Sequence, residues 1–425
     1  MIVVCEPQCT GASHEKVNSG FLTLVRRAYP GEAIRFYADG SHYAELQRML
    51  AHDGVAVDGI EHREFVVRDA NTIGGIVAYR RQLARMLEEA AAAGCHDVLF
   101  LSASPVILHL LKRLKGRAKF ARFRFTLVLH ADFEDIANNV FAPVKMATVA
   151  KPSLLKKLHM IRPWELPKKV AGLVSRKARD RYARIFQERF RAREQLLWRP
   201  SPDFAFIALA PHVVTNAARY VDVNALQIRC VWMPINFAPG ASAPENDHLK
   251  IATFGIGEPA TLRVVVDHLN ALAPKRPYEI RIIGMDNRGL ENAPHVYCPS
   301  PGKRLAREEM ERHAADIDAF LILYPKTRYR LSCSGAILEA LSYEKPVLHL
   351  GNPCVEPFDR PGSPIGQRCE TPEDLARVLA RMIDDYPAAR AGFEQNRKNI
   401  AKLRAELGME NLAPMFRAAF LRATT

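Results

Sequence analysis

The sequence predicts an α/β protein made of two doubly wound domains that face each other across a cleft. Three observations predict this class. Buried apolar runs alternate with helical patterns, this alternation stops once and begins again, and 425 residues are too many for one ordinary core. Strands that alternate with helices form parallel sheets covered by helices. Ligands of such sheets bind outside the carboxyl ends of the strands, so the cleft is the expected site.

The first alternation runs from the N-terminus to about residue 234. Short apolar runs predict buried strands, and apolar residues at every third or fourth position predict helices. The longest helical pattern, Asn71–Ala93, is amphipathic and rich in Ala, Leu and Arg. In chain order we expect strand Ile2–Cys5, helix His14–Ala28, strand Ala33–Tyr37, helix Ser41–His52, helix Asn71–Ala93, and strands Asp97–Leu101, Phe125–His130, Phe204–Ala208 and Cys230–Pro234.

The second alternation follows the stretch FAPGASAPEND, whose Pro, Ala and Gly content is typical of an interdomain linker. Its last helix, Thr371–Asp384, opens on Thr-Pro-Glu-Asp, an N-cap with an acidic first turn. Before it we expect strand Lys250–Phe254, helix Thr261–Leu272, strands Tyr278–Ile283 and His295–Cys298, helix Arg307–Ala315, strand Ala319–Leu323, a helix from Ser334 and strand Val347–Leu350.

These elements suggest the following domain boundaries. Residues 1–238 form a first domain, residues 239–249 a linker, and residues 250–405 a second domain. The last stretch, residues 406–425, is expected to be a helix that could pack back on the first domain.

Composition and cysteine usage exclude several classes of protein. No apolar run reaches the roughly 18–20 residues that a membrane-spanning helix needs. The N-terminal MIVVCEPQC lacks the basic start and the cleavage site of a secretory signal. The eight scattered cysteines form neither a small disulfide framework nor a paired metal-binding pattern. We therefore expect a cytoplasmic protein.

The net charge of +14 is concentrated in one segment of the first domain. Residues 143–200 hold 16 Lys or Arg against 4 Asp or Glu, interleaved with Leu, Ile, Val, Phe and Trp. Basic helices of this composition bind anionic membrane surfaces, while a solvated helical insertion is the plainer interpretation. Clustered basic residues also suit nucleic acid, but no recognisable nucleic-acid-binding motif accompanies them. A peripheral position on the inner face of the cell membrane is the expected location.

The helix that begins near Ser334 has the features of a phosphate site. It follows a buried strand, so its N-terminus should point into the cleft, where backbone N–H groups and the helix dipole attract anions. Ser334, Gly335 and Ala336 are small enough to let a diphosphate approach the backbone. Glu339, one and a half turns later, could accept hydrogen bonds from ribose hydroxyls. An ordinary capped helix with a surface Glu explains the same spacing.

Basic and small residues in neighbouring loops could complete this site. Arginine and lysine side chains make charge-assisted contacts with phosphate oxygens, and glycines allow close backbone approach. The candidates are Lys326, Arg328 and Arg330 before the helix, Gly255 and Gly257 in the loop GIGEPA, and Arg263 in the helix after that loop.

The run SGAILEALSYEKPVL resembles the donor-binding helix of GT-B glycosyltransferases, especially those of the large family 4 type. That family has a Glu-x7-Glu motif followed by Ala and then usually Gly-x-Pro-Val. Glu339-Ala340-Leu341 and Lys345-Pro346-Val347 match its second half, and Glu344 stands where Gly is usual. The stretches GIGEPA, RIIGMD, DIDAFLILYP and VWMPINF are also similar to parts of these enzymes. The resemblance implies two Rossmann-like domains, a nucleotide-sugar donor and a ribose-binding role for Glu339.

The chain departs from the motif at its first Glu, which contacts the sugar in many retaining members of the family. Leu331 occupies that position, and none of its sequence neighbours is an acid. The departure is compatible with another way of holding the sugar, a different stereochemical course, another GT-B activity such as epimerisation, or lost activity.

The first domain is expected to hold the acceptor and any general base. Two loops follow strand ends there: CTGASHEKVNSG carries His14 and Glu15, and HADFED carries His130 and Asp132. His or Glu can take a proton from an acceptor hydroxyl. Capping of the following helix explains His14 and Glu15 equally well, and a satisfied, partly buried side chain explains His130.

No metal motif is present, so Lys, Arg and the helix dipole would neutralise the diphosphate, and no cofactor is expected. The sequence thus predicts a metal-independent glycosyltransferase (EC 2.4 class) that moves a sugar from a nucleotide-sugar donor to a glycan or lipid-linked acceptor. The alternative is a catalytically degenerate GT-B protein that acts as a membrane- or polyanion-binding module.

Overall fold

The computed structural model describes residues 1–56, 58–70, 72–131, 134–138, 191–237, 244–255, 257–284, 289–301 and 305–422. These residues form two compact units. The first unit consists of the described residues of Met1–Ile235, Leu331–Cys333 and Met409–Thr425. The second consists of those of Asn236–Arg330 and Ser334–Gly408. Most of the basic segment 143–200 lies outside the described residues.

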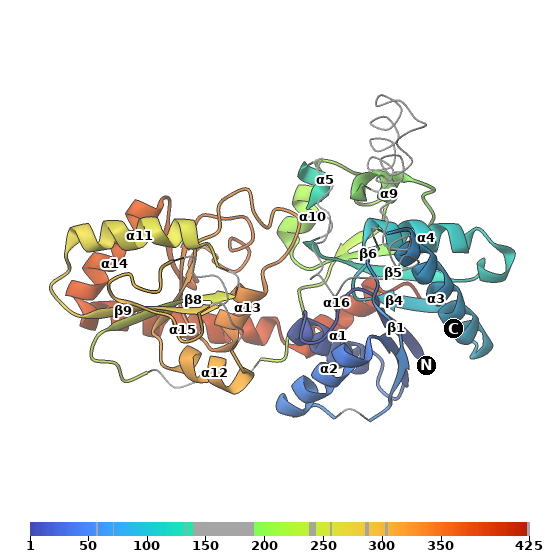
Figure 1. Ribbon diagram of the computed structural model, residues 1–425, viewed down its shortest axis with the longest axis horizontal. Coiled ribbons are helices and arrows are strands. Elements are labelled where there is room, and N and C mark those ends of the chain that lie inside the picture. Colours follow the sequence, from blue (N-terminus) through green and yellow to red (C-terminus); the bar gives the residue numbers. More distant parts are fainter. Residues whose placement is uncertain are drawn as a thin grey trace, which may run out of the picture. The chain divides into compact units, whose positions relative to one another are not determined.

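The first unit is built on a parallel sheet of seven strands within the described part of the chain (Figure 1). Its order is β3-β2-β1-β4-β5-β6-β7. Strands β2 and β3 are added on one side of β1 and strands β4 to β7 on the other, so the order of strand addition reverses between β1 and β4. In a doubly wound sheet this reversal separates the loops that follow the two strands and leaves room for a ligand. The strands are β1 Ile2–Glu6, β2 Ile34–Ala38, β3 Ile60–Glu64, β4 Asp97–Phe100, β5 Arg124–Leu129, β6 Phe204–Ala208 and β7 Ile228–Cys230.

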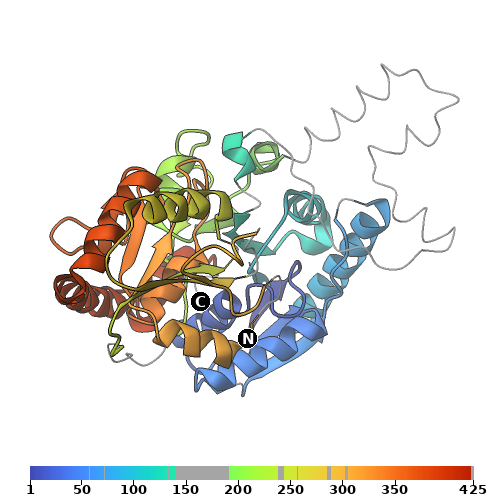
Figure 2. The same ribbon diagram turned by 60° about the vertical axis from the view of Figure 1, so that its left-hand side comes forward.

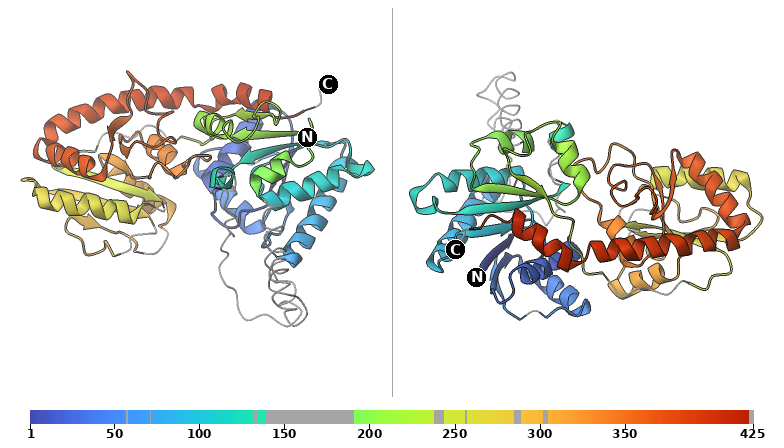
Figure 3. Two further views of the ribbon diagram at one scale, coloured as in Figure 1. Left: turned by 90° about the horizontal axis from the view of Figure 1, so that it is seen from above. Right: turned by 180° about the vertical axis from the view of Figure 1, so that it is seen from behind.

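Helices pack in separate groups against this sheet. α1 Glu15–Ala28 contacts α2 Gly40–His52 and also α16 Met409–Ala419, so the C-terminal helix belongs to the first unit (Figure 3). A second group contains α3 Ile73–Ala92 and α4 Pro105–Lys115. The remaining described helices of this unit are the short 3-10 helix Ala118–Phe120, α5 Asp135–Asn138, α9 Ala192–Leu197 and α10 Pro211–Ala217.

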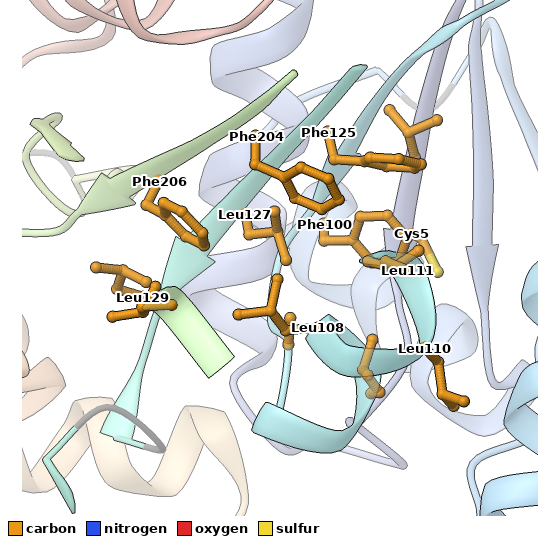
Figure 4. Close-up of a cluster of buried hydrophobic side chains, with 14 of the residues drawn as sticks. Cys5, Phe100, Leu108, Leu110, Leu111, Phe125, Leu127, Leu129, Phe204 and Phe206 are labelled. Atoms are coloured by element: carbon orange, nitrogen blue, oxygen red, sulfur yellow. The ribbon is translucent and has the colours of Figure 1, made fainter. Parts of the chain in front are cut away.

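The core of the first unit is aromatic. Figure 4 shows phenylalanines from β4, β5 and β6 beside leucines of α4. The rings of Phe125 and Phe204 have centroids 5.0 Å apart, and those of Phe100 and Phe125 are 6.3 Å apart. These strands are buried along nearly their whole length because helices cover both faces of a parallel sheet.

The second unit contains a parallel sheet of six strands in the order β10-β9-β8-β11-β12-β13 among the described residues. Figures 1 and 2 show α11 Pro259–Leu272 and α14 Pro372–Asp384 on one side of this sheet and α12 Arg307–Ala315 on the other. The other elements are β8 Leu249–Gly255, β9 Tyr278–Gly284, β10 Val296–Tyr297, β11 Ala319–Ile322, α13 Gly335–Ser342, β12 Val347–Leu350, β13 Gly366–Cys369 and α15 Tyr386–Glu406.

Most expected elements lie within two residues of the observed ones, and both predicted alternations are confirmed as parallel α/β sheets. The expected strand Cys230–Pro234 is wrong in position, because β7 ends at Cys230. After it the chain stays paired to the end of β6 only through single bonds, from Val231 N to Ala208 O and from Met233 N to Leu209 O.

Several observed elements were not predicted, among them β3, β13, α4 and α15. Edge strands β3 and β13 have polar, largely exposed sequences that carry no alternating pattern. Helix α4 is buried on almost every side. Helix α15 is long but largely polar.

Buried lysines anchor two helix ends. Lys112 on α4 donates to the carbonyls of Gln195, Leu196 and Trp198 at 2.7, 3.0 and 2.6 Å, which satisfies the end of α9. Lys345 is fully buried and donates to the carbonyls of Ala315 and Ile317 at 2.8 and 2.7 Å, where α12 ends. Burial lowers the pKa of each of these two lysines to about 8.

None of the described helices combines the length and the apolarity that crossing a membrane requires.

The low pKa of Lys345 predicts a pH-dependent stability. Because its folded pKa of about 8 lies below the unfolded value of roughly 10.4, the unfolded chain binds more protons between these values. The free energy of unfolding should therefore rise with pH in this window, relative to Lys345→Met, by about 3 kcal/mol in all. Urea unfolding at pH 7 to 10.5 measures the difference. For the control Lys402→Met, at an exposed position, the free energy of unfolding should change with pH as it does in the wild type. If the free energy of unfolding of Lys345→Met also changes with pH as in the wild type, the prediction is contradicted.

Candidate functional site

Two loops of the second unit meet at the carboxyl ends of neighbouring strands, β8 and β11. Glu258, in the loop after β8, forms an ion pair with Arg328, in the loop after β11. Gly255 ends β8 with φ 74°, a conformation that other residues rarely adopt. A Cβ at Gly284, its partner on β9, would lie 2.0 Å from the Gly255 carbonyl oxygen, so close strand approach requires glycine there.

The loop after β11 is built around two tyrosines. Their rings, Tyr324 and Tyr329, have centroids 4.6 Å apart, and the Arg328 guanidinium lies 5.7 and 5.1 Å from them. Fully buried Asn352 donates to the carbonyls of Pro325 and Arg328 at 2.7 and 3.1 Å. Tyr329 has φ 55°, and strained non-glycine residues of this kind cluster at ligand sites. The loop is thus held in one shape before α13 begins.

The N-terminus of α13 has no side-chain cap. Ser334 occupies the N-cap position, but its hydroxyl forms a 2.9 Å hydrogen bond with the Tyr324 hydroxyl instead of a backbone N–H. Burial raises the pKa of Tyr324, which keeps its hydroxyl protonated. A Cβ at Gly335 would meet nothing within 4 Å. No side chain caps the first N–H groups of the helix, and there is space beside Gly335, as an anion site requires.

Glu339 is held by Arg307, the first residue of α12. The two guanidinium nitrogens Nη1 and Nη2 donate to Glu339 Oε1 and Oε2 at 2.9 and 3.3 Å. Nε donates to Glu311 Oε1 at 2.9 Å. Burial alone would lower the pKa of Arg307, but the charge and hydrogen bonds of Glu339 outweigh it and raise the pKa. No local pattern indicates this pair, since the two residues are 32 positions apart.

The remaining predicted donor-site residues have diverse surroundings. Lys326 is exposed and pairs with Glu370 at 3.3 Å, while exposed Arg263 donates to the Gly289 carbonyl at 2.9 Å. Gly257 has φ 69°, and Ala336 and Arg330 are partly buried. The contacts between these loops place Gly255, Gly257, Arg328, Ser334 and Gly335 near one another. Lys326 and Arg263 instead make their contacts at the surface.

Leu331, at the position of the family's first Glu, belongs with its two successors to the first unit. Its side chain is 1% exposed and forms part of the first unit's apolar core. Glu134, in the stretch HADFED, accepts hydrogen bonds from Leu331 N at 2.8 Å and Ser332 Oγ at 2.6 Å. His212 Nε2 lies 3.0 Å from the Ser332 carbonyl oxygen. Although no sequence neighbour supplies an acid, a distant one binds this backbone.

The first unit brings together two of the candidate bases. The rings of His14 and His130 have centroids 5.0 Å apart in an edge-to-face arrangement. His14 is exposed, has φ 54° and stands at the N-cap of α1 without a side-chain cap bond, and Glu15 is the first residue of that helix. Asp132 lies outside the described residues.

His130 has the features of a neutral hydrogen-bond acceptor. Its Nε2 is shielded from solvent and has no hydrogen-bond partner among the described residues. The ring also bonds the Leu101 backbone, which leaves Nδ1 as the donor nitrogen. Burial, followed by the proximity of His14, lowers the pKa of His130 to about 3. The imidazole therefore stays uncharged at neutral pH.

A buried carboxylate, Glu6, shapes the loop between β1 and α1 and was not among the predicted residues. It is 1% exposed and accepts from Gln8 N, Cys9 N and Asn18 Nδ2 at 2.8, 3.2 and 3.1 Å, and from Ser102 Oγ. In the sequence, the position of this acid directly after the apolar run IVVC could have indicated that Glu6 is a site residue. Among the described residues, no group of three or more His, Cys, Asp or Glu could hold a metal ion.

Comparison with solved structures identifies the fold. The chain is similar to a glycosyltransferase from Rickettsia africae (12% identity, TM-score 0.57, covering 99% of this chain and 97% of that one). It is also similar to the lipopolysaccharide outer core galactosyltransferase WaaB (14% identity, TM-score 0.55, covering 98% of both chains). A third similar structure is Anabaena HepE in complex with UDP-glucose (14% identity, TM-score 0.55, covering 98% of this chain and 100% of that one).

These structures are GT-B glycosyltransferases, and the chain has the GT-B fold. The predicted fold class is thereby confirmed. No protein-family model matches the sequence, and neither does any curated protein.

The burial of Leu331 predicts that restoring the family's acid would destabilise the protein. Leu331→Glu would place a carboxylate in an apolar core, at a cost of about 3 kcal/mol or more. Because burial raises the pKa of such a group, the loss should grow from pH 5 to pH 8. Thermal unfolding at both pH values measures it. Thr327→Glu, at an exposed position of the preceding loop, is the control. Equal melting temperatures for both variants would refute the account.

Proposed function

We propose that the protein is a glycosyltransferase (EC 2.4 class) that takes a sugar from a nucleotide-diphosphate-sugar donor. The observation that carries this proposal is the open, uncapped N-terminus of α13 in a GT-B fold, with Glu339 later on the same helix. Backbone N–H groups at that end would bind the diphosphate, and Glu339 would bind the ribose. The complex of the similar HepE with UDP-glucose supports a uridine nucleotide as the first donor to try.

The chemistry would consist of electrostatic stabilisation of the leaving diphosphate together with orientation of the acceptor. Preorganised N–H donors stabilise developing charge without having to reorganise. Arg328 and Arg330 adjoin the start of α13 in the sequence and would add positive charge, so the proposed reaction uses no metal ion and no cofactor.

His130 is the residue that we assign to the acceptor. Its shielded Nε2 would complete its hydrogen bonding by accepting one from the acceptor hydroxyl, which orients that oxygen. The exposed His14, whose ring lies edge-to-face with that of His130, would favour the neutral state of His130, since a second positive charge nearby is unfavourable. We propose a glycan or a lipid-linked sugar as the acceptor. The basic segment 143–200 supports a place on the cytoplasmic face of the membrane.

A thermal-shift panel with UDP, GDP, ADP, dTDP, CDP and CMP, without added metal, tests the donor site. At a ligand concentration 100 times its dissociation constant, a bound nucleotide stabilises the protein by about 2.7 kcal/mol, so one member should raise the melting temperature. Glu339→Gln combined with Arg330→Ala should abolish the rise. If no nucleotide shifts the folded wild type, the donor site is refuted. Binding to vesicles containing anionic phosphatidylglycerol would then favour the module without catalysis.

The Tyr324–Ser334 hydrogen bond predicts a rescue experiment. Tyr324→Phe removes the partner of the Ser334 hydroxyl, which can then cap α13 and compete with the diphosphate. A cap is worth about 1 kcal/mol, so the affinity for the bound nucleotide should fall about fivefold. Adding Ser334→Ala removes the competing cap and should restore the affinity. Isothermal titration of the single and double variants measures this, and a double variant as weak as Tyr324→Phe would contradict it.

A further inference from the structure

Arg307 is a site residue that no motif in the sequence indicates. It begins α12, and its guanidinium bridges two carboxylates, Glu311 on the same helix and Glu339 on α13. The side chains of Arg307 and Glu339 are only 15% and 12% exposed. The pair is therefore largely desolvated, and a charge-assisted fork of this kind fixes geometry as well as charge.

The geometry constrains the direction of the Glu339 carboxylate. Each of its oxygens receives one guanidinium N–H, at 2.9 and 3.3 Å, so the carboxylate plane is aligned with the guanidinium plane. Glu311 occupies Nε at 2.9 Å and keeps the guanidinium from turning. A carboxylate has about four acceptor sites, and a fork to both oxygens uses two of them, so each oxygen of Glu339 keeps one acceptor site on its outer side. A ribose hydroxyl can donate to such an outer site.

We propose that Arg307 is a positioning residue that orients Glu339 to accept a hydrogen bond from the ribose 2′-hydroxyl of the donor nucleotide. This inference rests on the proposed function, because it assumes that a nucleotide binds at α13. Its consequence is a preference for ribonucleotides over 2′-deoxyribonucleotides that depends on the fork at Arg307 and not on its charge alone.

A purely structural ion pair between α12 and α13 is the competing explanation. Buried ion pairs are weak contributors to stability, since desolvation offsets much of the attraction. A structural pair would also be insensitive to the sugar of the nucleotide. The ratio of ribo to 2′-deoxy affinity therefore separates the two explanations, whereas overall stability does not.

The experiment compares dissociation constants on the full chain by isothermal titration. The probes are UDP, GDP, ADP and CDP, each with its 2′-deoxy counterpart, and the ratio is taken for the tightest pair. The wild type should prefer the ribonucleotide about tenfold or more, the value of one hydrogen bond to a charged group. Arg307→Lys keeps the charge but loses the fork, so its ratio should fall to within about twofold of one. Glu311→Gln, which leaves both bonds to Glu339 in place, is the matched control and should keep most of the wild-type ratio.

Each outcome has one meaning. A folded Arg307→Lys with the wild-type ratio overturns the inference and leaves the proposed function intact. A wild type that binds nucleotides without preferring ribose also overturns only the inference. A wild type that binds none of the probes overturns the proposed function, and the inference with it. If Arg307→Lys does not fold, Glu339→Asp, which shortens the arm but keeps the charge, must show the same loss of preference, and an unchanged ratio there overturns the inference.

Discussion

The burial of parallel strands on both faces is the constraint on which the rest of this structure depends. Strands such as β5 and β6 carry mainly apolar side chains on both sides, so few polar groups lie within them. Polar groups are displaced to the loops at the carboxyl ends of the strands. Glu6, His130 and the two-tyrosine loop after β11 all occupy such positions. The same constraint also places a helix N-terminus next to each of these loops.

Leu331 shows how a departure from a family motif can have a structural cause. The tripeptide Leu331–Cys333 belongs to the first unit, where the leucine side chain is buried and Glu134 binds the backbone. A glutamate at this position would have to be buried among apolar side chains. The burial of Leu331 in the first unit explains why an apolar residue stands at this position.

Some predicted elements have the bounds that the structure shows. Helix Arg307–Ala315 and strands Phe204–Ala208 and Val347–Leu350 agree with the structure to the residue. Edge strands β3 and β13 were missed because polar, exposed side chains dominate them. Among site residues, the run Ser334–Glu339 could be found because its small residues and single acid lie within one helix. The partners Arg307 and Glu134 could not, since 32 and 197 positions separate them from the residues they bind.

The sequence by itself determined the two α/β alternations, the helix that begins after Ser334 and the acid on it. Local spacing decides these features, because a helix or a strand is specified by residues within a few positions of each other. Tertiary structure alone decided that Ser334 bonds Tyr324 rather than its own helix, that Arg307 aligns Glu339, and that His14 meets His130. These interactions depend on how strands are ordered within a sheet and which loops that order brings together. No local pattern encodes that order.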